Sequence, residues 1–300
     1  MIENINWYPG HMKKTRELIE QNLKLIDCVI EVIDARIPLS SRNPIIDKLV
    51  QSKTKIVLLN KIDLADSNQT KRWVNHFTSK GHYSIAVDSA TGTIKKLMEL
   101  LEEIQEEKNS QRDKKKKLRI MVVGVPNVGK STLINRLTGK KSTRTGNKPG
   151  VTRGKQWLTL TNGMQLLDTP GILWHKFEDN QLGLNLAFCG SIRDEILPLD
   201  ELALALLNQI KGDYLDAIIN RYSLDIEYMK KNMEDKQFEL DIELDDLTFN
   251  DVEAIDLMEA IAKKRGCIMS GGRIDYERVS KIIIDEFRSG KLERITLETV

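Results

Sequence analysis

The stretch VLLNKIDL, residues 57–64, is an apolar run that ends in Asn60, Lys61 and Asp63. Many nucleotide-binding proteins read a guanine base with Asn-Lys-x-Asp at the end of a buried strand. A second stretch, GVPNVGKS at residues 124–131, has the spacing of a phosphate-binding loop. Such loops usually precede the base-reading motif, whereas this chain has the two in the opposite order. Either one match is accidental, or the chain joins familiar parts in an unusual order.

The phosphate-loop match has the local context that this motif requires. A predicted strand at residues 118–124 leads into the loop, and a predicted helix begins at Ser131. Glycines let successive backbone N–H groups face the phosphates, and the helix N-terminus adds the positive end of its dipole. We expect Lys130 to bridge the β- and γ-phosphates and Ser131 to bind Mg²⁺. The predicted phosphate-binding residues are consecutive: Pro126, Asn127, Val128, Gly129, Lys130, Ser131 and Thr132.

The sequence DTPG, residues 168–171, is the next part expected in such a site. Asp168 ends a predicted strand at residues 164–168, so its carboxylate can hold a metal-bound water near the terminal phosphate. We expect the backbone N–H of Gly171 to contact the γ-phosphate. Lys130 and Gly171 are therefore predicted to take part in hydrolysis.

A further metal ligand is expected between the phosphate loop and the DTPG motif. The segment NKPGVTRG, residues 147–154, offers the hydroxyl of Thr152. Its glycines and proline suit a segment that orders and disorders with the nucleotide, so Thr152 is also expected to act in hydrolysis. Thr143 and Thr145 lie nearby and remain alternative donors. The predicted Mg²⁺ ligands are Ser131, Thr152 and Asp168.

The base-reading motif predicts guanine rather than adenine. An Asp carboxylate can accept both N1–H and the exocyclic N2–H of guanine, whereas adenine has no N1–H to offer. Asp63 is the residue that would make this distinction. The next predicted strand, residues 83–87, is followed by a Ser-Ala pair where a backbone contact to the base oxygen belongs. The predicted base-binding residues are Asn60, Lys61, Asp63, Ser89 and Ala90.

Six segments are predicted strands because they are short, rich in Val, Ile and Leu, and bounded by turn residues. They are residues 28–34, 55–60, 83–87, 118–124, 155–161 and 164–168. Helical stretches separate the first four, which indicates a parallel sheet wrapped by helices. The last two flank Asn162-Gly163, a strong hairpin signal, so one antiparallel edge strand is expected.

This arrangement explains the reversed order of the motifs. If the usual last helix is joined to the usual first strand and the chain is opened elsewhere, every contact survives, because termini of compact domains often lie close together. The connector would be residues 105–119. We therefore predict an α/β fold: a circularly permuted Ras-like P-loop GTPase domain with a six-stranded, mostly parallel sheet at residues 1–177. A small all-helical domain is expected at residues 178–300.

The net charge of +2 conceals an asymmetry along the chain. Residues 1–174 carry 30 Lys and Arg against 17 Asp and Glu, which gives +13. Residues 175–300 carry 16 against 27, which gives −11. A basic front half attracts polyanions such as nucleic acid, although charges that only keep a surface hydrated explain the pattern equally well.

Other features narrow the class of protein. No apolar run approaches the length of a membrane span, and the first residues lack the pattern of a secretion or transit signal, so a cytoplasmic protein is expected. Cys28, Cys189 and Cys267 are odd in number and far apart, which favours buried reduced thiols over disulfides or a zinc site.

Several longer stretches resemble the bacterial ribosome biogenesis GTPase A family of permuted GTPases. They are WYPGHMKKT near the start, DARIPLSSRNP, LNKIDL, GVPNVGKSTLINRL, PGVTRGKQW, LLDTPGILWHKFED and the C-terminal GGRIDYERVSKIIIDEFRSGKLERITLE. The resemblance covers essentially the whole chain. It implies a GTPase that binds a large ribosomal subunit precursor through rRNA and ribosomal proteins, with an rRNA-binding C-terminal domain, and leaves on hydrolysis. We expect no membrane partner, because apolar spans are missing from the sequence, and no DNA partner. The alternative is an RNA-binding placeholder that GTP only stabilises.

The resemblance also bears on single residues. Ile172 occupies the position of the water-orienting glutamine, so intrinsic hydrolysis is expected to be slow and to be stimulated by the ribosomal particle. The resemblance nominates His11 to position the water, whereas a capping or surface role is the alternative. Asn127 is similar to the asparagine with which related GTPases hold K⁺; shaping the loop is its alternative role.

Overall fold

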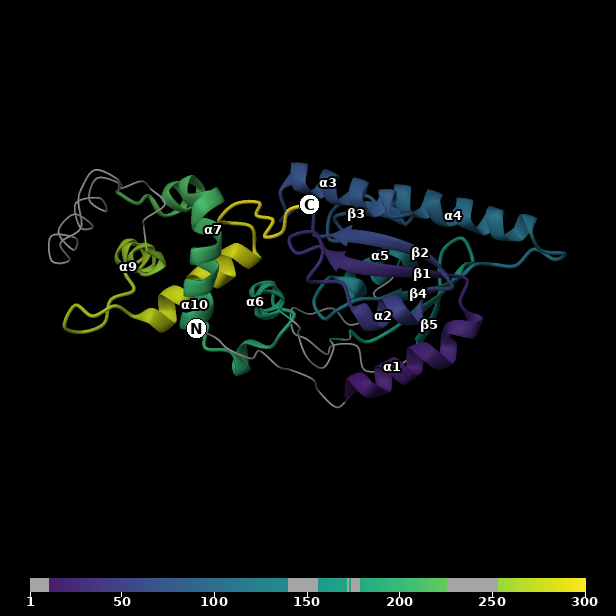
Figure 1. Cartoon of the computed structure of the whole chain (residues 1–300), viewed down its shortest axis with the longest axis horizontal. Helices are drawn as coiled ribbons and strands as arrows, with labels where there is room; N and C mark the ends of the chain where they lie inside the picture. Colours follow the sequence, from purple (N-terminus) through teal and green to yellow (C-terminus); the bar gives the residue numbers. More distant parts are fainter. Residues whose placement is uncertain (1–10, 140–155, 172, 174–178, 226–252) are drawn as a thin grey trace. The chain divides into compact units, whose positions relative to one another are not determined.

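The computed structural model describes residues 11–139, 156–171, 173, 179–225 and 253–300 (Figure 1). Thr143, Thr145, Thr152 and Ile172 lie outside these residues, as does the side chain of His11. The described chain forms two compact units. One comprises residues up to Arg193 together with Glu298–Val300, and the other is Asp194–Leu297.

The boundary therefore falls later than the expected 177/178. The reason is helix α6, Asn180–Phe188, which belongs to the first unit. Asn185 on this helix and Ser191 just after it hydrogen-bond to residues near the start and middle of the first unit. The last three residues also return to the first unit, so the helical unit is an insertion with two chain connections.

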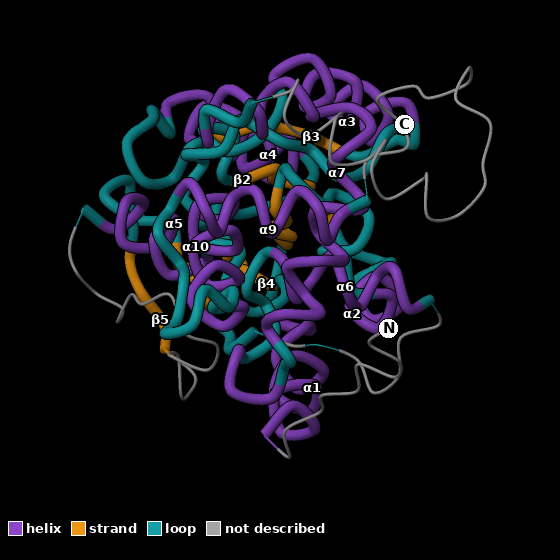
Figure 2. Tube along the Cα trace, turned by 90° about the vertical axis from the view of Figure 1, so that its left-hand side faces the viewer, coloured by secondary structure: helices purple, strands orange, loops and turns teal. Residues whose placement is uncertain are grey.

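The first unit contains the predicted six-stranded sheet. Its strands are β1 (Cys28–Asp34), β2 (Thr54–Asn60), β3 (Tyr83–Val87), β4 (Arg119–Val123), β5 (Gln156–Thr159) and β6 (Gln165–Asp168). Their order is β3-β2-β1-β4-β6-β5, and only β5 pairs antiparallel. Figure 1 shows β1 and β2 as neighbouring arrows that point the same way. The strands, orange in Figure 2, all belong to this unit. The predicted fold class is confirmed.

The first unit has helices between its first four strands and after the phosphate loop, as expected, together with α1 (His11–Asn22) and α6. The remaining elements are the 3₁₀ turn η1 (Leu23–Leu25), α2 (Pro44–Leu49), α3 (Ser67–Ser79), α4 (Lys95–Ser110) and α5 (Lys130–Thr138). Helix α3 buries Trp73 and Phe77 against Ile33, Val57 and Leu59 of the sheet. Asp66 caps this helix by accepting a hydrogen bond from the Gln69 N–H.

The connector between α4 and β4 is shorter than the expected residues 105–119. Helix α4 continues to Ser110 although its last buried apolar residue is Ile104. The Asn109 side chain pairs with the backbone N–H and C=O of Lys116, and Gln105 accepts the Leu118 N–H. These polar contacts, which a search for apolar periodicity cannot find, hold the connector against the helix end.

The second unit is mainly helical among its described residues. Its elements are the 3₁₀ turn η2 (Asp194–Ile196), α7 (Leu199–Tyr222), α9 (Ala254–Lys264) and α10 (Tyr276–Arg288). An isolated bridge pairs Ile268 with Ile274. Glu286 on α10 accepts hydrogen bonds from Arg221 at the end of α7 and from Arg265 after α9. This charge cluster joins the helices around a core of Leu and Ile side chains.

Candidate guanine nucleotide site

The phosphate loop follows β4 and ends where α5 begins at Lys130. Gly124 has φ +149°, and a Cβ there would lie 2.3 Å from the Val32 carbonyl oxygen on the neighbouring strand. Gly129 has φ +92°, and a Cβ there would lie 2.2 Å from Asn60 Nδ2. A side chain at either position would collide with packed atoms, which explains the motif's glycines physically.

Lys130 is buried inside its own loop. Its Nζ donates to the carbonyls of Gly124 at 3.1 Å and Val125 at 2.7 Å. Burial lowers the pKa of Lys130 to about 8, although the negative charge of Asp168 opposes that shift. The hydrogen-bond partners of Lys130 are neutral carbonyl groups, and the phosphates of a bound nucleotide would provide a negatively charged partner for this ammonium group.

Asp168 ends β6 with a buried, poorly solvated carboxylate. The residue is 1% exposed, and neither of its carboxylate oxygens has a hydrogen-bond partner of normal geometry among the described residues. Burial raises the pKa of Asp168 to about 6, while Lys130 and the adjacent Thr169 N–H lower it. Two unsatisfied oxygens beside a phosphate loop fit a hydrated Mg²⁺, whose positive charge would stabilise the ionised carboxylate.

Gly171 lies directly against the phosphate loop. A Cβ at this position would be 2.8 Å from Pro126 Cα and 2.9 Å from Lys130 Nζ. The Thr169 hydroxyl donates to the Val122 carbonyl at 2.7 Å, which fixes the motif beside β4. The structure thus brings Lys130, Asp168 and Gly171 together as the sequence predicted.

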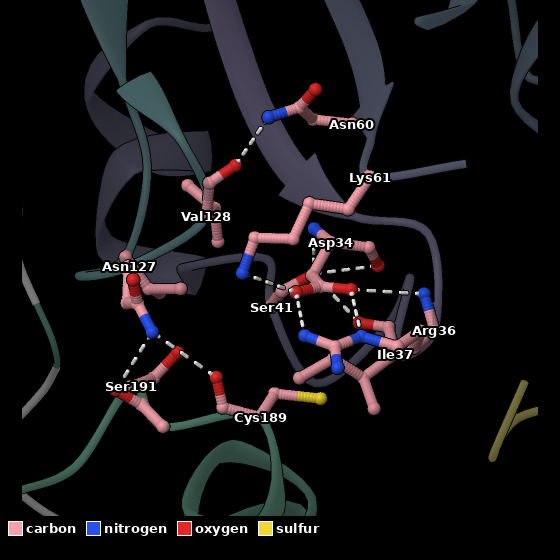
Figure 3. A network of polar contacts seen from close by, with 12 residues as sticks. Asp34, Arg36, Ile37, Ser41, Asn60, Lys61, Asn127, Val128, Cys189 and Ser191 are labelled. Carbon is pink, nitrogen blue, oxygen red and sulfur yellow. Dashed lines mark hydrogen bonds and ion pairs between the residues drawn. The ribbon is translucent and has the colours of Figure 1, made fainter. Parts of the chain in front are cut away.

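Asn60 connects the base-reading and phosphate-binding parts. Its Nδ2 donates to the Val128 carbonyl at 2.7 Å, and its Oδ1 accepts the Ser89 N–H at 3.0 Å and the Ser89 hydroxyl at 2.7 Å. Figure 3 shows Asn60 reaching across to Val128. Asn60 therefore positions two loops, a role that the motif match alone did not indicate.

Lys61 joins a buried ion-pair group that the sequence analysis did not predict. Its Nζ lies 3.1 Å from Asp34 Oδ2, and Arg36 donates to both Asp34 oxygens at 2.9 and 2.8 Å (Figure 3). Asp34 and Arg36 are each 1% exposed. Burial alone would raise the pKa of Asp34, but Arg36 and Lys61 hold it well below its usual value. The only sequence signal was a charged Asp-x-Arg at the end of an apolar strand.

The base side of the site is more open. Asp63 is exposed, and its pKa is raised by partial burial and by the nearby charge of Asp88. The Ala90 N–H, which was expected to face the base, donates to Asp88 Oδ1 at 2.7 Å. Arg136 on α5 donates to the Ala90 carbonyl at 3.0 Å and so anchors this loop to the phosphate side. Contact of the Ala90 N–H with a base would require the Asp88 bond to open or to be shared.

The outer side of the phosphate loop is held by the turn after α6. Asn127 has φ +61°, and its Nδ2 approaches the carbonyls of Cys189 at 3.4 Å and Gly190 at 3.3 Å. The Ser191 hydroxyl donates to the Pro126 carbonyl at 2.9 Å. Figure 3 shows the Asn127 side chain directed toward Cys189 and Ser191. These bonds hold the phosphate loop against the turn after α6. The K⁺-binding role of Asn127 stays a prediction.

The remaining predicted residues are placed as follows. Val128 is buried, while Ser131 and Thr132 are half-buried in the first turn of α5. Cys28, Cys189 and Cys267 are buried free thiols, as expected. No group of three or more His, Cys, Asp or Glu within the described ranges is arranged to hold a metal ion. No helix among those same residues is long and apolar enough to cross a membrane.

The fold and the convergence of both motifs define the class of protein: a circularly permuted P-loop GTPase. Residues 119–238 match the family model of the 50S ribosome-binding GTPases, and residues 45–178 match that of the RsgA GTPases. Ribosome biogenesis GTPase A of Bacillus cereus is 42% identical over 302 residues, which cover 98% of this chain and 94% of that protein. The chain belongs to the ribosome biogenesis GTPase A family and is a GTP-hydrolysing enzyme.

Solved structures agree with this assignment. GDP-bound TM YlqF is similar with a TM-score of 0.64 and 28% identity, covering 94% of this chain and 98% of that one. GNP-bound YlqF from T. maritima has a TM-score of 0.60 and 29% identity, covering 95% and 98%. These two structures are GDP-bound and GNP-bound, and this chain is likewise a guanine nucleotide-binding protein.

Proposed function

We propose that this GTPase is an assembly factor for late maturation of the large ribosomal subunit, acting in the cytoplasm. In its GTP form it binds the precursor particle, and hydrolysis releases it. The observation that carries this proposal is the near full-length match to ribosome biogenesis GTPase A, together with the match of residues 119–238 to the 50S ribosome-binding GTPases.

The site residues have distinct roles in this proposal. Lys130 and the backbone of the phosphate loop bind the phosphates, and the backbone N–H of Gly171 contacts the γ-phosphate. Ser131, Thr152 and Asp168 hold Mg²⁺, which when bound neutralises phosphate charge. The two unsatisfied oxygens of Asp168 support this assignment. Asp63 selects guanine, and its exposed carboxylate is accessible to a base.

Hydrolysis without the ribosomal particle is proposed to be slow. Ile172 has no hydrogen-bonding side chain, so another group must orient the attacking water. His11 is the candidate, and docking on the particle would bring it into position. K⁺ held near Asn127 would supply further positive charge; the Asn127 amide nitrogen faces two carbonyls, which leaves its oxygen as the ligand atom.

The helical unit is proposed to bind rRNA. Lys263, Lys264, Arg273, Arg278 and Lys281 are all exposed on or beside α9 and α10. In contrast, Arg221 and Arg265 pair with Glu286, and Arg288 pairs with Asp194. The exposed cations are therefore available for phosphate contacts, which favour polyanions in a salt-dependent way.

Co-sedimentation with large-subunit precursors tests the proposal directly. Wild-type protein with a non-hydrolysable GTP analogue should pellet with the particles, and protein with GDP should remain in the supernatant. GTP turnover should rise when particles are added. Equal binding in both nucleotide states with unchanged turnover would favour the placeholder alternative. Small subunits serve as the control particle.

A further inference from the structure

Glu298, two residues before the end of the sequence, accepts hydrogen bonds from several donors of the GTPase unit. Its carboxylate accepts the Leu39 N–H at 2.6 Å, the Ser40 N–H at 3.0 Å and the Ser40 hydroxyl. Asn185 on α6 donates to the same carboxylate at 3.1 Å. The Glu298 carbonyl accepts from Trp73 Nε1 at 3.0 Å. One residue thus joins a loop, α6 and α3 of the same unit.

The elements that Glu298 joins are those that hold the nucleotide site. The loop after β1 carries Arg36, which fixes Asp34 and through it Lys61 of the base-reading motif. Ser41 in this loop hydrogen-bonds the Asp34 N–H at 3.0 Å. A change in the loop's position would therefore alter the support of Lys61.

Helix α6 carries the connection to the phosphate side. Asn185 is 3% exposed and also donates to the Ser40 hydroxyl at 3.1 Å. One turn further on, α6 ends in the segment whose carbonyls receive Asn127 and whose Ser191 binds the Pro126 carbonyl. Glu298 therefore contacts both supports of the site without contacting the site itself.

We propose that Glu298 is a positioning residue that keeps the phosphate loop and the base-reading motif in their nucleotide-binding arrangement. The preceding residue, Leu297, belongs to the helical unit, so Glu298 is the first residue of the GTPase unit after the chain leaves the helical unit. The proposal concerns GTP and GDP binding and does not depend on the ribosomal partner.

Release of a fluorescent GDP analogue from the full chain tests this role. Glu298→Ala should release it roughly three- to tenfold faster at 25 °C, which corresponds to about one hydrogen bond of net stabilisation. Thr299→Ala changes the exposed neighbouring residue and should leave release unchanged. Amide exchange at residues 127–130 should accelerate in the Glu298 variant only.

A double-mutant cycle separates positioning from general stability. Asn185→Ala should accelerate GDP release as Glu298→Ala does, and the double variant should add little to either. If Glu298→Ala releases the GDP analogue at the wild-type rate, the proposal is overturned, whether or not the melting temperature of the variant falls. Should Glu298→Ala fail to fold, Glu298→Gln retains the size of the side chain. Glu298→Gln should then release the GDP analogue faster than wild type, and a wild-type rate would again refute the proposal.

Discussion

Two groups of buried charges lie at the carboxyl ends of β1 and β6, two strands that β4 separates, and they differ in how many hydrogen bonds and ion pairs they make. Asp34, at the end of β1, has a bidentate Arg36 and an ammonium from Lys61. Asp168, at the end of β6, is influenced by the charge of Lys130 and by the Thr169 N–H, but neither of its oxygens has a hydrogen-bond partner within the described residues. The partners of Asp34 therefore stabilise its ionised form and lower its pKa. Burial without such partners raises the pKa of Asp168.

The difference indicates which group is scaffold and which is binding site. A buried charge without partners destabilises the free protein, so it persists where a ligand supplies the missing interaction. Phosphates and Mg²⁺ would satisfy Lys130 and Asp168 in that way. The Asp34 group needs no ligand, because its partners are other residues of the same unit.

The largest expected effect comes from breaking the satisfied group. Arg36→Met removes both side-chain hydrogen bonds to Asp34 and leaves the buried carboxylate with the backbone N–H of residue 36 and Lys61 as partners. We expect a loss of about 3–5 kcal/mol in the free energy of unfolding. Urea denaturation of the nucleotide-free protein measures it. Arg16→Met, at an exposed i,i+4 ion pair on α1, is the matched control and should change stability by less than about 0.5 kcal/mol.

Removing charge from the unsatisfied group should have the opposite sign. Asp168→Asn should stabilise the nucleotide-free protein at pH 7 by about 1–3 kcal/mol, because one pKa unit corresponds to about 1.4 kcal/mol. The same variant should lose Mg²⁺-dependent GTP hydrolysis. A destabilised Asp168→Asn protein would show that the carboxylate is satisfied after all.

The pH dependence of stability follows from the same carboxylate. The pKa of Asp168 in the folded protein, about 6, is above its ordinary 3.8. Between these values the folded state retains a proton that the unfolded state has released, so the free energy of unfolding should fall as pH rises from about 4 to 6. Comparing thermal unfolding of wild type and Asp168→Asn across this range isolates the contribution, since the variant should lack this component of the slope.

A smaller effect on stability is expected at Asn60, which links the phosphate loop to the loop that carries Ser89. Asn60→Ala removes one bond to Val128 and two to Ser89, and we expect about 1–2 kcal/mol of destabilisation together with weaker nucleotide binding. Calorimetry with GDP and urea denaturation measure the two quantities. Asn109→Ala, which removes side-chain bonds on the exposed connector, provides a control and should leave GDP affinity unchanged.

The smallest effect on stability should come from Asp63, because its side chain is exposed. Asp63→Asn is expected to change the free energy of unfolding by no more than about 0.5 kcal/mol. Nucleotide preference should nevertheless shift from guanine toward xanthine. The C2 oxygen of xanthine accepts a hydrogen bond from the Asn amide, whereas the 2-amino group of guanine can only donate. Competition between GDP and XDP for the variant reveals this, and unchanged guanine preference would remove Asp63 from the base-reading role.

The sequence predicted most of the fold and the core of the site. The six strands were placed within a few residues, and the antiparallel hairpin around Gly163 was expected from Asn-Gly alone. The motifs around Lys130 and Asp168 were also found, because they are short patterns whose residue types the phosphate chemistry requires. The domain boundary was placed too early, since α6 reads as one more helix and only its packing assigns it to the first unit.

Local pattern therefore determined the strands, the order of the motifs and the guanine nucleotide class, because each depends on residues close together in the chain. Tertiary structure alone decided that Asn60 bridges two loops, that Arg36 neutralises Asp34, and that Glu298 returns to bind Ser40. Each of these requires donor and acceptor atoms to approach within about 3 Å. For Asn60 and Glu298, packing brings together segments that are far apart in the sequence.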